Sequence, residues 1–371
     1  MNKVVIPRCA GATRPEFNHW HPILPSRQLR RGPAAVRLHA TDIVLFRTAA
    51  GQIGALDNSC PHRRMKLSLG KVMNDRLQCA YHGWTFDRGG AGQSPGTPKL
   101  HATAPAFDAL ERHGVIWLKS ADSRPTFPEF PTLAADGYYH LCNLHHVVNA
   151  PLEVTVDNFC EIEHTPTTHA FFGYALDTMH EVRVRFEPTE TSVRVINQGP
   201  PKRMAWLYRQ FLGVRPNYLF HDDWTTYFSP VYSVFNHWWA DPTTGKESLV
   251  RWKLFIFFTP RDERTTLLST FVFTRSRYPG PAGCMRPLRW LLRRKIDHEI
   301  RLDQRILENL ADQRPDLEGM KLSRFDKVLA LNRERINRIY RGGEPQRTAV
   351  HRGGDVRCVA PGDVRSGGGV A

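Results

Sequence analysis

The sequence predicts an α+β protein of two domains, a small all-β unit followed by a larger domain of strands and helices. Its 371 residues are enough for two domains that each bury a sizeable core. Short apolar or alternating segments, typical of strands, occupy the first third of the chain and return after a proline-rich interruption. Helical patterns come late, at about residues 285–312 and 323–340. This order of elements favours an α+β architecture.

The first domain is expected to span residues 17–122, after a loose lead-in of residues 1–16. Its strand-like segments include Ala35–His39 and Ile43–Phe46, where apolar residues alternate or cluster. Gly114–Leu118 is expected to close this small all-β unit.

A segment rich in proline and alanine, residues 123–138, suits a linker between the domains. The second domain is expected to span residues 139–345 and to open with a helix-like segment near 150–164. A long β-rich region follows, from about residue 182 to 274. The last residues, 346–371, are rich in glycine and arginine without periodicity, and we expect them to be disordered.

The chain is strongly basic, with a formal net charge of +15 and a pI near 9.8. Such a balance favours acidic partners. No nucleic-acid-binding module is recognisable, so we expect no nucleic-acid partner. The one dense basic run is Met285–Lys295. It could begin a membrane-surface helix, form a docking patch for an acidic ferredoxin, or be the solvated face of an ordinary helix.

The remaining composition indicates a cytoplasmic enzyme. No apolar run is long enough to span a bilayer, and the N-terminus lacks the apolar stretch of a secretory signal. Seven cysteines show no spacing typical of a disulfide framework, which fits a reducing compartment.

Two short motifs between residues 60 and 82 carry metal-binding chemistry. Cys60 is followed two residues later by His62, and Cys79 three residues later by His82. A structural zinc site usually takes a different ligand spacing. One thiolate and one imidazole from each half suit a [2Fe–2S] cluster with both thiolates on one iron and both imidazoles on the other.

This stretch resembles the Rieske cluster motif, with Cys60 and Cys79 as thiolate ligands and His62 and His82 as imidazole ligands. The Gly-Trp pair after the second histidine matches the usual ending of the motif. One departure is Ala80, where many members have proline, and it leaves the four ligands untouched.

A second constellation lies after the linker. Asp157, Glu161 and His164 fall at positions i, i+4 and i+7, so a helix would place them on one face. On a straight helix His169 would point about 140° away from His164. Pro166 lies between the two histidines and would break or kink the helix, which lets His169 swing back toward His164.

Two histidines need a carboxylate to complete a facial triad for Fe(II). Four apolar residues of the late helix form a stripe: Ile296, Ile300, Leu307 and Leu310. Asp303 fills the gap in that stripe and is expected to face the core, either as a metal ligand or as a buried carboxylate bonded to backbone. Asp297, Glu299 and Glu308 lie off the stripe and are expected to face solvent.

The run Asn158-x-x-Glu161-x-x-His164-x4-His169 resembles the mononuclear-iron motif of the α-subunits of Rieske non-haem iron oxygenases. The segment that begins at Asp303 likewise resembles their late motif, whose aspartate is the third iron ligand. The resemblance implies that His164, His169 and Asp303 bind Fe(II). It also places Glu161, where most members have Asp, as the acidic bridge between the cluster and the iron, with Asn158 beside it.

The resemblance covers residues 17–345 and implies an N-terminal Rieske domain and a C-terminal helix-grip (START-like) domain with an antiparallel sheet. It implies an O2-dependent oxidoreductase in which electrons pass through His82 and Glu161 to the iron. Because the two centres of one chain are too far apart in this family, it also implies a head-to-tail homotrimer. No flavin or nicotinamide signature is present, so a separate ferredoxin or flavin reductase would consume NAD(P)H.

The aromatic-rich second domain favours a hydrophobic substrate, cyclic or aromatic, that is most simply monohydroxylated. The ending Leu322 to Ile339 loosely resembles aminopyrrolnitrin-oxygenase-like members, which hints at secondary metabolism. Dioxygenation, O- or N-demethylation and N-oxidation by the same centres stay open. A Rieske electron-transfer protein fused to a ligand-binding module without iron is a further alternative. The pairs His145-His146 and His19/His21 lack a partner carboxylate and are expected to be surface or loop histidines.

Overall fold

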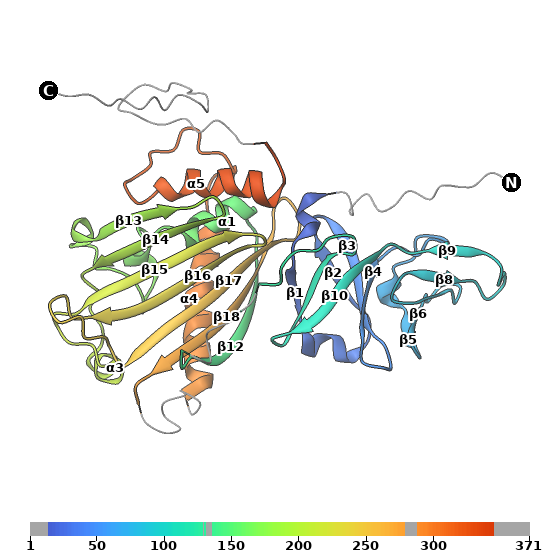
Figure 1. Ribbon diagram of the computed structural model, residues 1–371, viewed down its shortest axis with the longest axis horizontal. Coiled ribbons are helices and arrows are strands. Elements are labelled where there is room, and N and C mark those ends of the chain that lie inside the picture. The colour runs from blue at the N-terminus through green and yellow to red at the C-terminus, as the bar shows by residue number, and fades with distance from the viewer. Residues whose placement is uncertain (1–13, 129, 131–135, 279–287, 345–371) are drawn as a thin grey trace, which may run out of the picture.

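The computed structural model describes residues 14–128, 130, 136–278 and 288–344. Figure 1 shows two bodies side by side along the longest axis, the N-terminal one all-β and the C-terminal one a large sheet with helices. Most of the expected lead-in, part of the expected linker and the expected disordered tail lie outside the described residues. So does the start of the basic run, whose described part begins at Leu288.

The N-terminal body contains two antiparallel sheets. The larger has the strand order β1-β11-β10-β4-β3-β2. Its strands are β1 (His21–Pro25), β2 (Ala34–Leu38), β3 (Thr41–Arg47), β4 (Ile53–Asp57), β10 (Ala106–Arg112) and β11 (Val115–Ser120). The smaller sheet runs in sequence order through β5 (Lys71–Met73), β6 (Arg76–Gln78), β7 (Thr85–Phe86), β8 (Ala91–Gln93) and β9 (His101–Thr103). Short strands of this kind need the apolar layer between them for stability, which Phe46, Leu77 and Phe86 help to form.

The C-terminal body is built on one antiparallel sheet with the order β12-β18-β17-β16-β15-β14-β13. Its strands are β12 (Tyr139–Val148), β13 (Arg183–Pro188), β14 (Ser192–Gly199), β15 (Leu219–Phe228), β16 (Val231–Ala240), β17 (Val250–Pro260) and β18 (Thr266–Ser276). Runs of β-branched and aromatic residues explain these long strands. Consecutive strands from β13 to β18 pair as neighbours, and β12 closes the sheet on β18.

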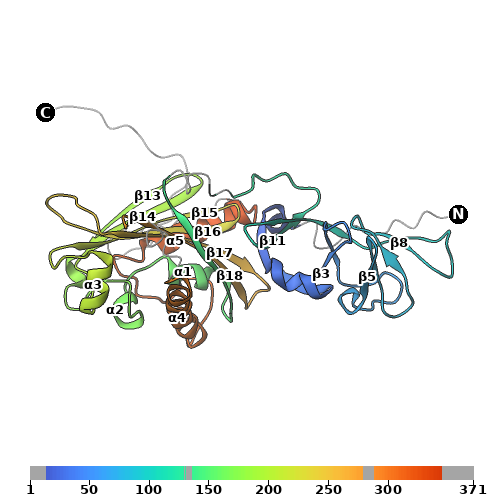
Figure 2. The same ribbon diagram turned by 90° about the horizontal axis from the view of Figure 1, so that it is seen from below.

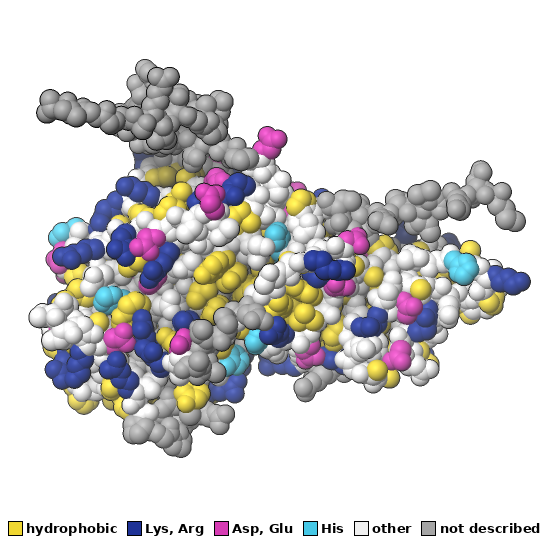
Figure 3. All heavy atoms as spheres, viewed as in Figure 1, with side chains coloured by type: hydrophobic (Ala, Val, Ile, Leu, Met, Phe, Trp, Pro, Cys, Tyr) yellow, Lys and Arg dark blue, Asp and Glu magenta, His cyan; other side chains and the backbone are white. Residues whose placement is uncertain are grey.

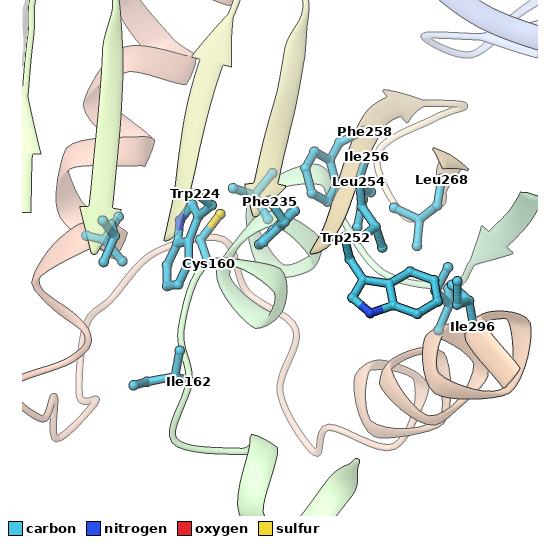
Figure 4. Packing of buried hydrophobic residues seen from close by; sticks show 14 of the residues in the cluster. Cys160, Ile162, Trp224, Phe235, Trp252, Leu254, Ile256, Phe258, Leu268 and Ile296 are labelled. Carbon is cyan, nitrogen blue, oxygen red and sulfur yellow. The ribbon is translucent and has the colours of Figure 1, made fainter. Parts of the chain in front are cut away.

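Helices cover one face of this sheet. They are α1 (Leu152–Phe159), α2 (Thr165–Thr168), α3 (Trp206–Leu212), α4 (Arg289–Glu308) and α5 (Lys327–Arg335), the last continuing into a π-helical turn (Ile336–Tyr340). Figure 2 shows α1, α2 and α4 on the same side of the sheet. In Figure 4, Ile296 of α4 lies beside Trp252 of β17, and Cys160 lies beside Trp224 of β15. This layer between sheet and helices is the main core.

The two bodies meet through an apolar interface. The ring of Trp117, on β11, lies 5.0 Å from that of Phe257 and 5.8 Å from that of Phe271, on β17 and β18. Trp20 belongs to the same cluster. Because these rings are buried from both sides, the first body is packed onto the outer face of the sheet rather than loosely tethered to it.

Histidines at this interface correct one expectation. His21 is buried on β1, so a surface or loop position was wrong for it, whereas His19 is buried but lies in a loop. Away from this interface His146 is buried on β12, so the expectation was wrong for it too. His19 stacks on the ring of Tyr340, with centroids 5.1 Å apart, and its Nε2 lies 3.0 Å from the Tyr340 carbonyl oxygen. Residues more than three hundred positions apart are thereby joined.

Exposed charge is spread over the molecule. On the face shown in Figure 3, Lys and Arg side chains lie on both bodies, among fewer acidic side chains and some apolar patches. Within the part of the chain that the structure describes, no helix is long and apolar enough to cross a membrane.

Candidate metal centres

The first candidate centre is formed by two loops at the end of the N-terminal body. One loop follows β4, and in it the Cys60 N–H donates to the Met65 carbonyl at 2.9 Å. The other connects β6 to β7, where the Cys79 N–H donates to the Trp84 carbonyl at 2.7 Å. Gly83 has a φ of +68°, which a glycine adopts without strain and which turns the second loop back into β7. Each loop therefore presents its cysteine and histidine from a tight hydrogen-bonded turn.

The four predicted ligands separate into two like pairs. Cys60 and Cys79 are buried and their thiols are in contact; burial and this neighbour raise the pKa of the Cys60 thiol. His62 and His82 are exposed, with ring centroids 4.5 Å apart, and the His62 ring stacks on Trp84. A thiol pair inside and an imidazole pair outside fit a cluster whose two irons are ligated unequally.

The second candidate centre surrounds a turn between two helices. The expected continuous helix over 150–164 ends at Phe159, so Glu161 and His164 lie in the following turn. Pro166 does not break a helix; it stands in the first turn of α2, where its missing N–H costs nothing. His164 and His169 flank this single-turn helix at its two ends, and both imidazoles therefore reach the same side.

The side chains of His164, His169 and Asp303 converge on one point. The Nε2 atoms of the two histidines are 3.1 Å apart. Asp303 Oδ1 lies 3.4 Å from His164 Nε2 and 3.3 Å from His169 Nε2. Three ligands on one face of an octahedron are separated by about 1.4 times the metal–ligand distance, so this triangle corresponds to a distance of about 2.2–2.4 Å. The three residues thus fit a facial triad for a divalent metal ion.

Three further side chains hold this triangle in place. Glu161 bonds Nδ1 of His164, and Glu299 Oε2 lies 3.1 Å from Nδ1 of His169. Asn158 donates from Nδ2 to Asp303 Oδ1 at 3.0 Å. A carboxylate next to Nδ1 favours the tautomer with the proton on Nδ1, which leaves the lone pair of Nε2 available to bind a metal ion.

The site is strongly polarised. Burial alone would raise the pKa of Asp303, but hydrogen bonds with His164 and His169 outweigh it and lower that pKa to about 2. Burial alone would lower the pKa of His164, but hydrogen bonds with Asp303 and Glu161 raise it to about 10. The buried carboxylates are therefore stabilised by positive charge at this point, which protons or a metal ion can supply.

Two expectations about acidic residues were wrong. Glu299 does not face solvent: its side chain is only 8% exposed and it contacts His169. It stands four residues before Asp303, so both point from the same face of α4, and that spacing could have identified it. Asp157 does not share a face with Glu161 and His164; it turns toward Arg333 and forms an ion pair of 2.6 Å with it.

A cavity of about 90 Å³ opens beside the triad. Its lining combines aromatic and aliphatic side chains of the sheet and of α4 with a few polar groups, among them Asp222 and His237. A second, apolar cavity of about 280 Å³ shares the lining residues Phe172, Ile296 and Glu299 with the first. Such largely apolar pockets with few polar groups are typical of small-molecule sites.

Residues 19–108 match the Rieske [2Fe-2S] domain family, and residues 148–341 match the vanillate O-demethylase oxygenase C-terminal domain family. The second match covers more than half of the chain. This protein belongs to the Rieske oxygenases. The family resemblance, the α+β fold class and the oxidoreductase class predicted from the sequence are thereby confirmed. So are the cofactors, because this family uses a Rieske [2Fe–2S] cluster and a mononuclear iron.

Curated relatives match parts of the chain. The oxygenase subunit of tert-butanol monooxygenase / tert-amyl alcohol desaturase from Aquincola tertiaricarbonis is 38% identical over 32% of this chain and 26% of its own length. Methylxanthine N1-demethylase NdmA from Pseudomonas putida is 37% identical over 31% of this chain and 36% of its own. 4beta-methylsterol monooxygenase from Methylococcus capsulatus is 26% identical over 67% and 66%. The chain thus spans about a quarter to two thirds of these relatives.

Solved structures share the fold over most of the chain. Dicamba monooxygenase bound to 3,6-dichlorosalicylic acid has a TM-score of 0.72 at 19% identity, covering 88% of this chain and 97% of that one. An NdmA mutant from Pseudomonas putida CBB5 with caffeine has a TM-score of 0.67 at 21% identity, covering 88% and 91%. At these identities the likeness shows a common fold.

Proposed function

We propose that this Rieske oxygenase uses O2 and electrons from a separate ferredoxin or flavin reductase to oxygenate a hydrophobic, ring-containing small molecule, most simply by monohydroxylation. The observation that carries the proposal is the triangle of His164, His169 and Asp303 at the edge of an apolar cavity. A substrate bound in this cavity would lie next to the metal ion, and such proximity lowers the entropic cost of the reaction.

Residues of this chain would hold both cofactors. Cys60, Cys79, His62 and His82 would bind the cluster, and His164, His169 and Asp303 the iron. When bound, the cluster supplies single electrons and the Fe(II) supplies O2 activation. Glu161 and Asn158 are assigned positioning roles. Glu161 contacts Nδ1 of His164, the ring nitrogen that points away from the triangle, and Asn158 donates a hydrogen bond to Asp303 Oδ1.

A head-to-tail homotrimer is part of the proposal. The cluster loops border β5 to β9, whereas the triad residues flank α2 and lie on α4, and Figure 2 shows β5 and β8 in one body and α2 and α4 in the other. Since electron transfer needs close approach, the cluster of one copy would serve the triad of another, with Glu161 at the contact. A ring of three copies closes such a heterologous interface.

O- or N-demethylation is a second candidate. It is favoured by the match of residues 148–341 to the vanillate O-demethylase oxygenase C-terminal domain and by the likeness to a methylxanthine N1-demethylase. Hydroxylation of a methyl group on oxygen or nitrogen gives an unstable product that releases formaldehyde. The same residues would therefore serve both reactions, and the position of the oxidised carbon in the cavity would decide between them. A cytoplasmic location and a role in secondary metabolism stay predictions.

The ratio of total iron to acid-labile sulfide in anaerobically purified protein tests the proposal. About three irons for two sulfides are expected for one cluster plus one mononuclear iron. His164→Ala and Asp303→Ala should lose only the excess iron. Equal iron and sulfide in protein supplied with Fe(II) would contradict an oxygenase and favour an electron carrier or binding protein.

A further inference from the structure

Asp222 and His237 form a polar pair inside the substrate cavity. They stand directly opposite each other on β15 and β16, and both line the cavity that holds the triad. Their closest atoms, Asp222 Oδ1 and His237 Nε2, are 3.0 Å apart. Only 10% of the Asp222 side chain and 12% of the His237 side chain are exposed. His164 and His169 flank α2 and Asp303 lies on α4, so this pair faces the triad from the sheet.

Both residues carry a buried polar atom without a partner. Asp222 Oδ1 is close to His237 but poorly aligned for a hydrogen bond, and His237 Nδ1 lies on the other side of its ring. Neither atom has a hydrogen-bond partner among the residues that the structure describes. Buried polar atoms are nearly always satisfied, since an unsatisfied one destabilises the fold. A hydrogen-bonding group on a bound molecule is one way to satisfy such an atom.

Aromatic rings surround the histidine. The His237 ring lies 4.9 Å from Phe172, 5.8 Å from Phe220 and 6.0 Å from Phe235, measured between centroids. These rings exclude water from the pair and offer flat apolar surface to a ring-shaped molecule. In such surroundings a hydrogen bond to Asp222 or His237 discriminates strongly between molecules that can make it and those that cannot.

Apart from the triad histidines, the charged side chains that line the cavity are acidic. Four carboxylates line it, those of Glu161, Asp222, Glu299 and Asp303. No Lys or Arg is found among its described lining residues. Glu161 and Glu299 contact the triad histidines, and Asp303 is the triad carboxylate. Asp222 is the lining carboxylate whose ion-pair partner, His237, lies outside the triad, so it is the acid best placed to meet the substrate.

We propose that Asp222 and His237 select a substrate whose polar group is uncharged or cationic and carries an O–H or N–H, and that they reject a carboxylate at that position. The pair accepts a hydrogen bond from the substrate, whereas a carboxylate would face Asp222 with like charge, and no Lys or Arg among the described lining residues offsets that repulsion. The apolar remainder of the substrate lies toward the neighbouring cavity formed by Phe171, Phe211 and Trp252. This inference rests on the proposed oxygenase function and narrows its substrate class.

Binding of matched ring compounds to the iron-loaded protein tests the inference. Two probe series are used, benzyl alcohol, benzylamine and benzoate, and cyclohexylmethanol with cyclohexanecarboxylate. Isothermal titration calorimetry is carried out without O2 and reductant, so that no turnover occurs. The alcohol and the amine are expected to bind at least about tenfold more tightly than the carboxylate of the same ring.

Asp222→Asn keeps the side-chain volume and removes the charge. It should therefore reduce the ratio of the carboxylate and alcohol dissociation constants by about tenfold. Asp223→Asn is the matched control, because Asp223 is the next residue on the same strand but pairs with Arg194 instead of lining the cavity. That control should leave the preference unchanged.

Equal or tighter binding of the carboxylates by the unmodified protein, or no binding of any alcohol or amine, would overturn the inference. Either result is obtained with the unmodified protein, so the test remains decisive even if a variant fails to fold. The iron-to-sulfide ratio of the same preparation keeps the two proposals apart. A ratio of about three to two with a carboxylate preference leaves the oxygenase proposal standing and removes only the selectivity assigned to Asp222 and His237.

Discussion

Glu299 Oε2 lies 3.1 Å from Nδ1 of His169, just as Glu161 contacts Nδ1 of His164. Each histidine of the triad therefore has a carboxylate behind it. This arrangement orients both rings and raises the basicity of the Nε2 atoms that face Asp303. Because Glu299 also accepts a hydrogen bond from the Ala170 N–H, it ties α4 to the end of α2.

Glu299→Gln should weaken Fe(II) binding at the triad by about 10- to 100-fold, because His169 loses its carboxylate partner. Competition with a chelator for Fe(II) measures the affinity, and the acid-labile sulfide content shows that the cluster is intact. Glu308→Gln, on the same helix but bonded to Asn149, serves as the control and should bind Fe(II) normally. Normal Fe(II) affinity in Glu299→Gln would show that the contact is only structural.

Mixed oligomers should reveal electron transfer between copies. Cys79→Ser is expected to lose the cluster and His164→Ala the mononuclear iron, so each variant alone should be inactive. If the cluster of one copy serves the triad of the next, co-expression at equal levels should restore roughly a quarter of the wild-type activity per chain. NAD(P)H-dependent O2 uptake measures it. Complete inactivity of the mixed protein would place both centres of one functional unit in the same chain.

Acid should destabilise the protein through His21. Burial lowers the pKa of His21 to about 3 in the folded protein. Between that value and about 6.5 the unfolded chain binds a proton that the folded protein does not, so stability falls as the pH falls. Through this residue alone, the free energy of unfolding should be about 2 kcal/mol lower at pH 5 than at pH 8.

Urea unfolding at pH 5 and pH 8 tests this effect. His21→Asn should unfold more easily at pH 8 but should lose less stability than the unmodified protein on going to pH 5. His180→Asn removes an exposed histidine and should keep the full pH dependence. An unchanged pH dependence in His21→Asn would mean that other groups cause the acid sensitivity.

Trp117→Ala should destabilise the protein by about 3–5 kcal/mol, because it empties the buried interface between the two bodies and removes a hydrogen bond to the Arg112 carbonyl. The free energy of unfolding from denaturant titration measures the loss. Trp290→Ala is the control, since that indole is 68% exposed, and it should change stability by less than about 1 kcal/mol. Similar losses in both variants would argue against a tightly packed interface.

The sequence by itself determined the parts of the protein that depend on local pattern. Cys60, His62, Cys79 and His82 could be predicted as cluster ligands because each pair of one cysteine and one histidine lies within four residues. Asp303 could be placed toward the core because helical periodicity reports which face of its own helix a residue occupies. The order of strands and helices followed from the same kind of periodicity.

Tertiary structure decided what lies opposite each of those faces. The sequence pattern could not show that Glu299 meets His169, that Asp222 meets His237, or that His21 is buried. Each of these contacts joins elements whose approach is set by sheet register or by packing between bodies rather than by neighbouring residues. Periodicity describes a residue relative to its own element, and a partner from another element is specified only when the whole chain has packed.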